Sequence, residues 1–284
     1  MLLIFGLGYS GTAVAREARA RGISVLGTTR ARATAPDRIG FETAEAAIAA
    51  ARWVLVTAAP GPAGDPVLAR HGTAIRRAVA AGGLRWVGYL SSTVVYGNRD
   101  GAWVDETTVP APSSPRGEAR VAAEAAWREA ASGAALDIFR LAGIYGPGRS
   151  VFDDLRAGTA RRVDRPGHAF GRIHRDDIAR AVLAAIDRTG SGARVFNLAD
   201  DLPAPSADVV AHAAGLLGVA PPALVPFDTA WAGMSPMARG FWAENRRVSS
   251  AATRAALGIT WRYPTYREGL AAILAQERGE HVAQ

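Results

Sequence analysis

The chain has 284 residues, of which 49% are hydrophobic and 21% charged, so it can bury a large core. Its formal net charge is +7, but all 33 basic residues are arginines, and they never gather into a stripe with aromatic residues. This distribution argues against binding to nucleic acid. The absence of cysteine excludes disulfides and thiolate metal ligands, and we expect no metal site. No apolar run approaches the roughly 20 residues that cross a bilayer. The short apolar start has no basic region before it, so we expect a cytoplasmic protein that does not bind membranes.

Short aliphatic runs alternate with alanine-rich helical patterns from the first residue onward. Continuous apolar strands separated by helices are typical of a parallel sheet that is covered on both faces. The chain is therefore predicted to be an α/β protein, a Rossmann-type doubly wound parallel sheet, with its ligand beyond the carboxyl ends of the strands. The strands are predicted at residues 2–5, 24–27, 53–57, 86–91 and 137–141, and the helices at 12–21, 44–51, 67–81 and 115–131.

The pattern changes after about residue 145, where glycine, proline and arginine become frequent. We interpret residues 1–145 as a dinucleotide-binding Rossmann domain. Residues 146–284 are expected to be mixed, completing the sheet and forming a small C-terminal cap over its carboxyl edge. In this second part a strand is predicted at 194–198, and helices at 176–187, 206–217 and 266–278.

A glycine signature follows the first predicted strand directly and opens the first predicted helix. Gly6, Gly8 and Gly11 have the spacing Gly-x-Gly-x-x-Gly, and Tyr9 and Ser10 lie in the same turn. The first glycine permits a tight turn, the second lets the backbone approach a pyrophosphate, and the third lets helix and strand pack closely. The unpaired amides of the helix N-terminus then suit a phosphate. These residues are predicted to bind a nicotinamide dinucleotide.

The end of the second strand indicates which nicotinamide dinucleotide binds. A site specific for NAD places a carboxylate there, about 20 residues after the glycines, to hold the ribose 2′-hydroxyl. This chain has Thr29 and Arg30 instead, and a guanidinium suits a 2′-phosphate. We therefore expect NADP in preference to NAD. Small residues at the end of the third strand, Thr57, Ala58 and Ala59, would let the dinucleotide lie over the sheet edge.

Several segments occur in an order typical of one family. Residues 90–97 read Leu-Ser-Ser-Thr-Val-Val-Tyr-Gly, and this stretch resembles the serine-bearing segment of the extended short-chain dehydrogenase/reductase family, best known for nucleotide-sugar epimerases and dehydratases. Residues 140–148, 172–179, 196–198 and 257–270 also resemble the family, in its order. The resemblance implies an NAD(P)-binding protein that acts on a small-molecule carbonyl or sugar-like substrate. A homodimer through the helices near 67–81 and 115–131 would follow the habit of the family.

The resemblance also implies catalytic positions, and two of them differ here. In the family a serine or threonine contacts the substrate oxygen, a tyrosine moves the proton, and a lysine four residues later supports it. The matching residues of this chain are Ser92, Arg116 and Arg120. Arg120 can still donate to the cofactor ribose. Arg116 stays protonated, so it cannot exchange a proton, although it can stabilise a developing oxyanion.

Several other residues are candidates to replace the missing acid. Tyr96 and Tyr145 match family positions used for packing, and His174 is expected to order a loop. His168 lies in a glycine-rich segment that could face the cleft. A further acidic pair, Asp105 and Glu106, is expected to be a solvated loop pair.

Three functions remain open from the sequence, of which the remotest is a scaffold without a ligand, in which Gly6, Gly8 and Gly11 are only structural. The first is an atypical NADP-dependent oxidoreductase or epimerase-like enzyme, in which Ser92 polarises a carbonyl and Arg116 stabilises charge. The second is a non-catalytic NADP(H)-binding sensor or regulatory protein, which the missing tyrosine favours.

Overall fold

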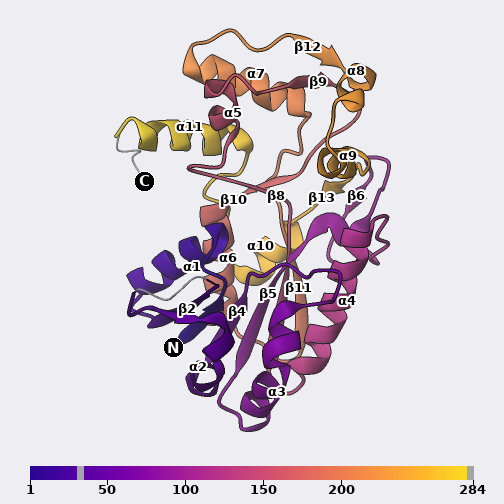
Figure 1. Cartoon of the computed structure of the whole chain (residues 1–284). Coiled ribbons are helices and arrows are strands. Elements are labelled where there is room, and N and C mark those ends of the chain that lie inside the picture. The colour runs from indigo at the N-terminus through magenta and orange to yellow at the C-terminus, as the bar shows by residue number, and fades with distance from the viewer. Residues whose placement is uncertain (31–34, 280–284) are drawn as a thin grey trace.

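The structure is a computed structural model that describes residues 1–30 and 35–279. Its centre is a parallel sheet of seven strands in the order β11-β7-β5-β4-β1-β2-β3 (Figure 1). The chain winds outward from β1 in both directions, which confirms the doubly wound Rossmann prediction. The strands are β1 (Leu2–Phe5), β2 (Val25–Thr29), β3 (Arg38–Gly40), β4 (Trp53–Val56), β5 (Trp86–Ser92), β7 (Ala135–Leu141) and β11 (Ala193–Leu198).

Helices cover both faces of the sheet because alternate strand residues point to opposite faces. Leu2 and Ile4 of β1 pack toward one layer, whereas Leu3 and Phe5 pack toward the other. The first layer holds α1 (Tyr9–Ala20), α6 (Arg175–Asp187) and α10 (Ala251–Leu257). The second holds α2 (Glu45–Ala50), α3 (Pro66–Ala80) and α4 (Pro115–Ala130).

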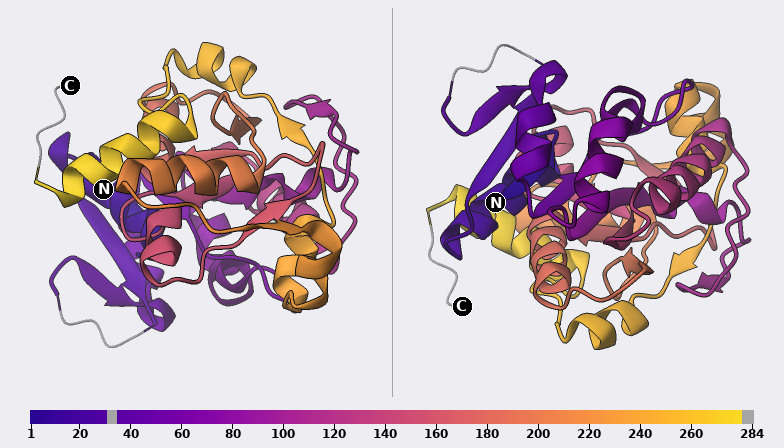
Figure 2. Two further views of the ribbon diagram at one scale, coloured as in Figure 1. Left: turned by 90° about the horizontal axis from the view of Figure 1, so that it is seen from above. Right: turned by 90° about the horizontal axis from the view of Figure 1, so that it is seen from below.

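Most of the remaining elements lie beyond the carboxyl edge of the sheet, at the top of Figure 1. There α7 and α11 run side by side (Figure 2) and share a small core with α5 and Tyr145. The other elements include three short parallel strand pairs, β8 with β10, β9 with β12, and β6 with β13. The bounds are η1 (Phe41–Thr43), η2 (Thr93–Tyr96), β6 (Trp103–Val104), β8 (Gly143–Tyr145), α5 (Val151–Arg156), β9 (Arg162–Asp164), β10 (Arg172–His174), α7 (Ser206–Leu217), β12 (Leu224–Pro226), α8 (Phe227–Ala232), α9 (Pro236–Trp242), β13 (Arg247–Val248) and α11 (Tyr266–Glu277).

The expected strands and long helices all form, with ends that move by one to three residues. The N-terminal end of α1 moves most: the helix begins at Tyr9 rather than at residue 12, because the glycine signature itself forms its first turn. The sequence reading missed β3, the three short strand pairs and the short helices α5, α8, α9 and α10. These elements are too short to carry a readable period. In the described parts of the chain, no helix is long and apolar enough to cross a membrane.

A buried ion pair joins α4 to the sheet. Arg140 on β7 donates from Nη2 and Nε to the two carboxylate oxygens of Glu124 on α4, at 2.8 and 3.1 Å, and both side chains are about 5% exposed or less. Ser91 donates to the same carboxylate at 2.6 Å, and Arg140 Nη1 donates to the Tyr96 hydroxyl at 3.0 Å. That hydroxyl in turn lies 2.8 Å from Asn197 Oδ1 on β11. The network therefore fixes α4 against three neighbouring strands.

Replacing Glu124 with glutamine should be strongly destabilising, because it leaves the Arg140 charge buried without a counter-charge. Breaking one side of a buried pair costs about 3–5 kcal/mol, which chemical denaturation would measure as a lower midpoint. The matched control is Glu17→Gln, since Glu17 pairs with Arg21 on the surface and both side chains are 37% exposed. That change should cost about 0.5 kcal/mol or less. Equal losses in the two variants would contradict the role given to the buried pair.

Candidate functional site

The glycine signature forms a tight turn between β1 and α1. Gly6 has a φ of +100°, which disfavours any residue with a side chain, and a Cβ there would lie 2.6 Å from Thr57 Oγ1. A Cβ on Gly11 would lie 2.2 Å from the Gly6 carbonyl oxygen. Thr57 donates to that same oxygen at 2.7 Å. Gly6 and Gly11 are therefore required by the turn itself, and Thr57 ties the turn to β4.

Gly8 differs from the other two glycines, because a Cβ at this position would meet no atom within 4 Å. It is the N-cap of α1 and offers no side-chain oxygen to the first-turn amides, so these amides remain available to an outside acceptor. Gly8, Tyr9 and Ser10 all line a large cavity, together with Thr57. Because the space in front of these uncapped amides is open, a pyrophosphate fits there. The turn is therefore suited to bind a dinucleotide.

Tyr9 extends from this turn to a loop in the second half of the chain. Its hydroxyl donates to the Pro147 carbonyl at 3.1 Å, and its ring lies beneath the guanidinium groups of Arg149 and Arg175, at 5.6 and 4.8 Å from the ring centroid. Desolvation raises the pKa of the Tyr9 hydroxyl. The side chain therefore connects the candidate phosphate site to the loop at 146–149.

The end of β2 lies at a second, smaller pocket of about 410 Å³. Thr29 and Arg30 line it together with Gly40, Phe41 and Glu42. Arg30 is exposed and forms no ion pair with any described residue, whereas Glu42 is paired with Arg70 at 2.7 Å. The guanidinium of Arg30 is thus available to an anion at this place.

Two residues of the predicted cofactor site, Ala58 and Ala59, do not lie at either of these pockets. Ala58 and Ala59 follow β4 but line neither of these two pockets. Thr28, next to Thr29, is buried, and its hydroxyl accepts from the Gly6 amide at 3.2 Å. Thr28 therefore supports the glycine turn.

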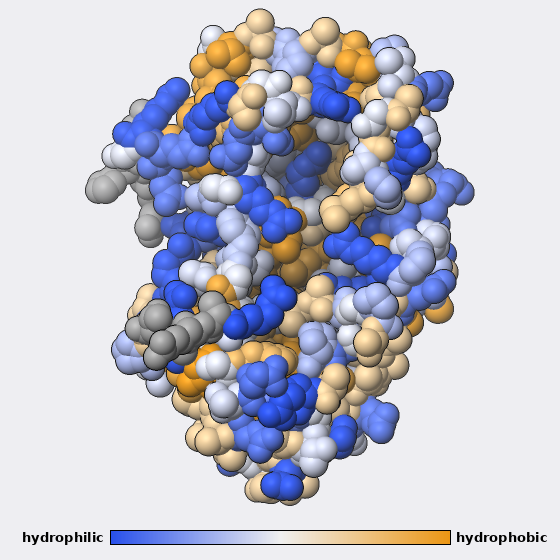
Figure 3. Space-filling view, in the orientation of Figure 1, coloured by the Kyte–Doolittle hydropathy of each residue, from blue (hydrophilic) through white to orange (hydrophobic). Residues whose placement is uncertain are grey.

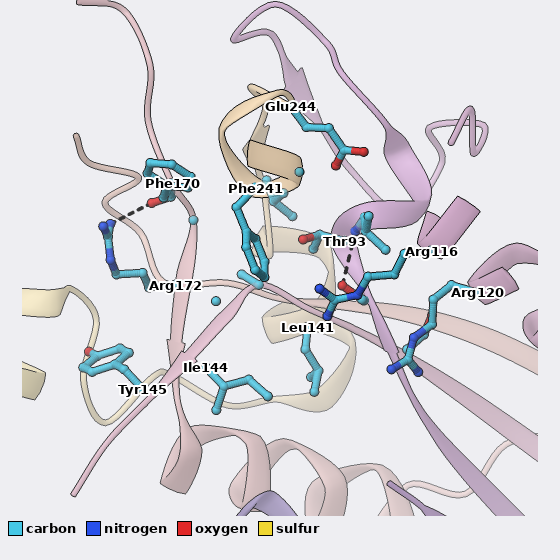
Figure 4. Close-up of a pocket in the computed structure, with 18 of the residues that line it drawn as sticks. Thr93, Arg116, Arg120, Leu141, Ile144, Tyr145, Phe170, Arg172, Phe241 and Glu244 are labelled. Carbon is cyan, nitrogen blue, oxygen red and sulfur yellow. Dashed lines mark hydrogen bonds between the residues drawn. The ribbon is translucent and has the colours of Figure 1, made fainter. Parts of the chain in front are cut away.

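The three predicted catalytic residues meet at the large cavity, which has a volume of about 860 Å³. Ser92 ends β5, and its hydroxyl accepts from the Val94 amide at 3.3 Å at the start of η2. Arg116 and Arg120 lie in the first two turns of α4, where a spacing of four residues places them on one face. Figure 4 shows Arg116 extending toward the middle of the cavity and Arg120 beside it.

Arg116 and Arg120 have different surroundings. The side chain of Arg120 is buried, and its Nη1 donates to the Leu90 carbonyl at 2.8 Å and to the Tyr89 hydroxyl at 3.1 Å. The guanidinium of Arg116 lies 5.3 Å from the centroid of the Phe241 ring and forms no hydrogen bond or ion pair with a described residue. Partial desolvation and the positive charge of Arg120 lower the pKa of Arg116, and Glu244 opposes this effect. A guanidinium nevertheless stays protonated at neutral pH, so Arg116 offers a fixed positive charge.

Residues from the second half of the chain close the cavity, and the sequence reading did not identify them. Figure 3 shows the hollow between the sheet and the upper part of the molecule, with an apolar interior and a hydrophilic rim. Phe241 of α9 and Ile144 of β8 contribute apolar surface, and Arg172 of β10 lies across from Arg116 in Figure 4. None of these positions stands out in the sequence, because each belongs to an element of only three to seven residues.

Glu244, which follows α9, connects this segment to the start of α4. Its carboxylate is 9% exposed and accepts from the hydroxyls of Ser113 and Ser114, at 2.9 and 3.3 Å, and from Arg246 at 2.6 Å. Ser114 also caps α4 by accepting from the Gly117 amide at 3.3 Å. Glu244 is the only acidic side chain among the described residues that line the cavity, and its hydrogen bonds position the turn that carries Arg116.

The expectation that His168 could face the cleft is wrong. Its ring is buried, packs on Phe170 and Trp242 with centroids at 4.6 and 5.2 Å, and does not line the cavity. Burial lowers its pKa to about 4, which leaves the ring neutral. His174 has a structural role, as expected, but it caps a helix rather than ordering a loop: its Nδ1 accepts from the Asp176 amide at 3.2 Å at the start of α6.

The two tyrosines are held in packed surroundings, as expected. Tyr96 belongs to the Arg140 network and does not line the cavity. Tyr145 does line it, but burial raises the pKa of its hydroxyl far above the ordinary value, so it is a poor proton donor at neutral pH. For Glu106 the expectation of a solvated residue is wrong. Its Oε1 accepts from Thr253 Oγ1 at 2.5 Å and from the Asn197 amide at 3.2 Å.

Asp200 is buried beside Arg172, which lines the cavity, and forms no ion pair with a described residue. Burial raises its pKa to about 8, although the positive charge of Arg172 opposes the shift. An acid whose pKa is raised in the folded state holds its proton more tightly there than in the unfolded chain. Its contribution to stability therefore falls as the pH rises from about 4 to about 8.

The variant Asp200→Asn should lose less stability than the parent protein as the pH rises. We expect the difference in unfolding free energy between the two proteins to widen in favour of the variant from pH 5 to pH 8, by up to about 1.4 kcal/mol for each pH unit. Urea denaturation at a series of pH values measures this difference. Asp201→Asn is the control, because Asp201 is exposed and paired with Arg254. A constant difference for Asp200→Asn would show that this carboxyl does not titrate as inferred.

Comparison with known proteins extends these observations. None of the protein-family models searched matches the chain. A curated relative from a Streptomyces species, the 3-diazoavenalumate denitrifying reductase, is 30% identical over 146 residues, which is 47% of this chain and 45% of that protein. Protein YeeZ of Escherichia coli K12 is 32% identical over 136 residues, 47% of each chain. These matches thus span less than half the length of the curated relatives.

Solved structures match over nearly the whole chain. A functionally unknown conserved protein from Silicibacter pomeroyi is 42% identical, with a TM-score of 0.89, and the match covers 97% of this chain and 98% of that one. A putative NAD-dependent epimerase/dehydratase from Methylobacillus flagellatus is 26% identical with a TM-score of 0.70, covering 98% of each chain. The human epimerase family protein SDR39U1, solved with NADPH, shares the fold at 18% identity and a TM-score of 0.76, covering 96% of this chain and 99% of that one. The chain therefore has the fold of these proteins, and the order of its sequence motifs resembles that of the extended short-chain dehydrogenase/reductase family.

Proposed function

We propose that the protein is an NADP-dependent reductase that acts on a carbonyl or related polarised group of a small molecule. The observation that carries this proposal is the convergence of the glycine turn, Ser92 and two arginines on a single cavity of about 860 Å³. The human relative of the same fold was solved with NADPH, and one partial relative is a reductase. These comparisons support a nicotinamide cofactor without identifying the substrate.

The residues that would hold the cofactor are those of the glycine turn and of the β2 end. The first-turn amides of α1, in front of the open space at Gly8, would accept the pyrophosphate. Arg30 and Thr29 would take the 2′-phosphate in the smaller pocket. Arg120, beside Ser92, would donate to the nicotinamide ribose with the guanidinium nitrogens that Leu90 and Tyr89 leave free. When bound, NADPH supplies a hydride to the carbonyl carbon.

The chain's own residues would act on the substrate oxygen. As the C=O electron pair moves onto oxygen, the Ser92 hydroxyl and the Arg116 guanidinium would stabilise the negative charge. The proton that completes the alcohol would come from solvent, because Arg116 cannot give one up and the Tyr145 hydroxyl is a still weaker acid than free tyrosine.

This arrangement favours reduction over oxidation or epimerisation. Oxidising an alcohol needs a base that removes its proton as the hydride leaves. Among the described residues that line the cavity, the only carboxylate is Glu244, and it is occupied by Ser113, Ser114 and Arg246. An alkoxide formed by reduction is in contrast basic enough to be protonated by water. We therefore infer a reductase in which electrostatic stabilisation replaces the tyrosine of the family.

Cofactor binding is tested by calorimetric titration with NADPH and NADH. We expect NADPH to bind at least about tenfold more tightly, because a charge-assisted hydrogen bond contributes about 1.5–3 kcal/mol. Arg30→Ala should remove this preference and leave NADH binding unchanged. Gly8→Ala should weaken both cofactors without lowering the melting temperature, since its Cβ meets no protein atom within 4 Å. Failure of both cofactors to bind at millimolar concentration would refute the proposed function.

Turnover is tested by following NADPH oxidation with a panel of aldehydes, ketones and quinones. Ser92→Ala and Arg116→Gln should each lower kcat by about 10²–10³-fold, the usual effect of losing an oxyanion donor, whereas Arg116→Lys should retain part of it. Arg128→Gln, on the exposed last turn of α4, is the matched control and should leave kcat unchanged. Tight NADPH binding with no turnover on any substrate would instead support the non-catalytic sensor that the loss of the tyrosine favours.

A further inference from the structure

Arg172 on β10 is a charged residue in the cavity without a counter-charge. Its Nη1 donates to the carbonyls of Phe170 and Ala204, at 2.9 and 3.2 Å, and it forms no ion pair with a described carboxylate. Burial lowers its pKa, so the charge is poorly solvated. A desolvated guanidinium of this kind gains most from an anion such as a carboxylate, to whose two oxygens its remaining N–H groups can donate.

The acid nearest to Arg172 does not supply that anion. Asp200 lies close enough to interact electrostatically but forms no ion pair with Arg172, and it is largely protonated at neutral pH. Two buried tyrosines, Tyr145 and Tyr266, also lie near Arg172, and burial raises the pKa of the Tyr145 hydroxyl. Among the described residues, none of these neighbours forms an ion pair with the guanidinium.

The other cavity arginines already have partners or other positions. Arg246 is paired with Glu244 and also donates to the Gly97 carbonyl at 2.9 Å. Arg120 donates to Leu90 and Tyr89, and Arg149 lies over the Tyr9 ring at the glycine turn. Arg172, although it also donates to two carbonyls, lies with Arg116 on opposite sides of the site, and Phe241 is between them (Figure 4).

The wall between these two arginines is apolar. Leu141, Ile144 and Phe170 line it from the sheet side and the β8–β10 pair, and Met237 and Phe241 line it from α9. Met237 and Phe241 are 73% and 53% exposed, so they present apolar surface that no other part of the described chain covers. An apolar body lying along this wall would cover that surface and gain the corresponding burial free energy.

Among the described residues, Arg172 forms no ion pair and lies at one end of this apolar wall (Figure 4). A guanidinium in that position matches a carboxylate on an apolar body.

We propose that the substrate is a small organic acid, an apolar or aromatic body with a carboxylate bound by Arg172 and its reducible group at Ser92 and Arg116. This inference rests on the proposed reductase function and specifies its substrate class. Arg172 is then the residue that determines specificity, because it fixes which end of the substrate enters the cap.

The experiment compares cinnamate with cinnamamide, which has nearly the same shape but no charge, by calorimetry on the protein with and without NADPH. We expect cinnamate to bind at least tenfold more tightly than cinnamamide. Arg172→Gln should reduce cinnamate to the affinity of the amide and leave the amide unchanged, and Arg172→Lys should give an intermediate value. Arg267→Gln is the matched control, because Arg267 also stacks on Tyr266 but does not line the cavity. It should change neither affinity.

Equal binding of acid and amide by the parent protein would overturn the proposal, and so would tighter binding of UDP-glucose than of cinnamate. These outcomes differ from a failure of the reductase function, which is read from NADPH binding and turnover of neutral carbonyl compounds. If Arg172→Gln fails to fold, Arg172→Lys and the acid–amide comparison on the parent protein still decide the question.

Discussion

The buried pair of Glu124 and Arg140 is the interaction on which the site depends. Two charges this far from water are held only because each satisfies the other and because Ser91 and Tyr96 complete their hydrogen bonds. The carboxylate comes from α4 and the guanidinium from β7, and Ser91 directly precedes Ser92 on β5. One geometry of α4 against the sheet therefore fixes the distance between Ser92 and the two arginines of the helix.

Because this geometry is fixed, having arginine in place of the family's tyrosine changes the chemistry that the site can perform. According to the resemblance, Arg116 takes the position of the family's proton-transferring tyrosine, and it brings a permanent charge instead of an exchangeable proton. A site of this kind can stabilise an oxyanion and cannot abstract a proton, so it suits the direction in which negative charge develops on the substrate. The position of Arg116 also depends on the cap, because Glu244 holds the serines at the start of α4.

The segments beyond the carboxyl edge of the sheet complete the cavity. The short pair of β8 and β10 brings Arg172 and Ile144 to it, and α9 adds Phe241 and Met237 from a segment more than a hundred residues after Arg116 in sequence. These elements are short because they are stabilised by the cap core and by contact with the sheet rather than by their own helix or strand propensity. The packing of these elements places the charge of Arg172 at one end of the cavity and apolar side chains along its wall (Figure 4).

The sequence by itself determined the sheet, its helices and the dinucleotide turn, because apolar periodicity and glycine spacing are local properties that the backbone must obey. Gly6 and Gly11 could be predicted in this way, and so could Ser92, Arg116 and Arg120 through the order of the motifs. Only the tertiary structure decided that Thr28 supports the turn, that His168 is buried among aromatic rings, and that Glu106 is hydrogen-bonded within the fold. It also brought Arg172 into the cavity without a counter-charge. Whether a polar side chain is solvated, paired or left without a partner depends on residues that are distant in the sequence. A local sequence pattern therefore cannot predict it.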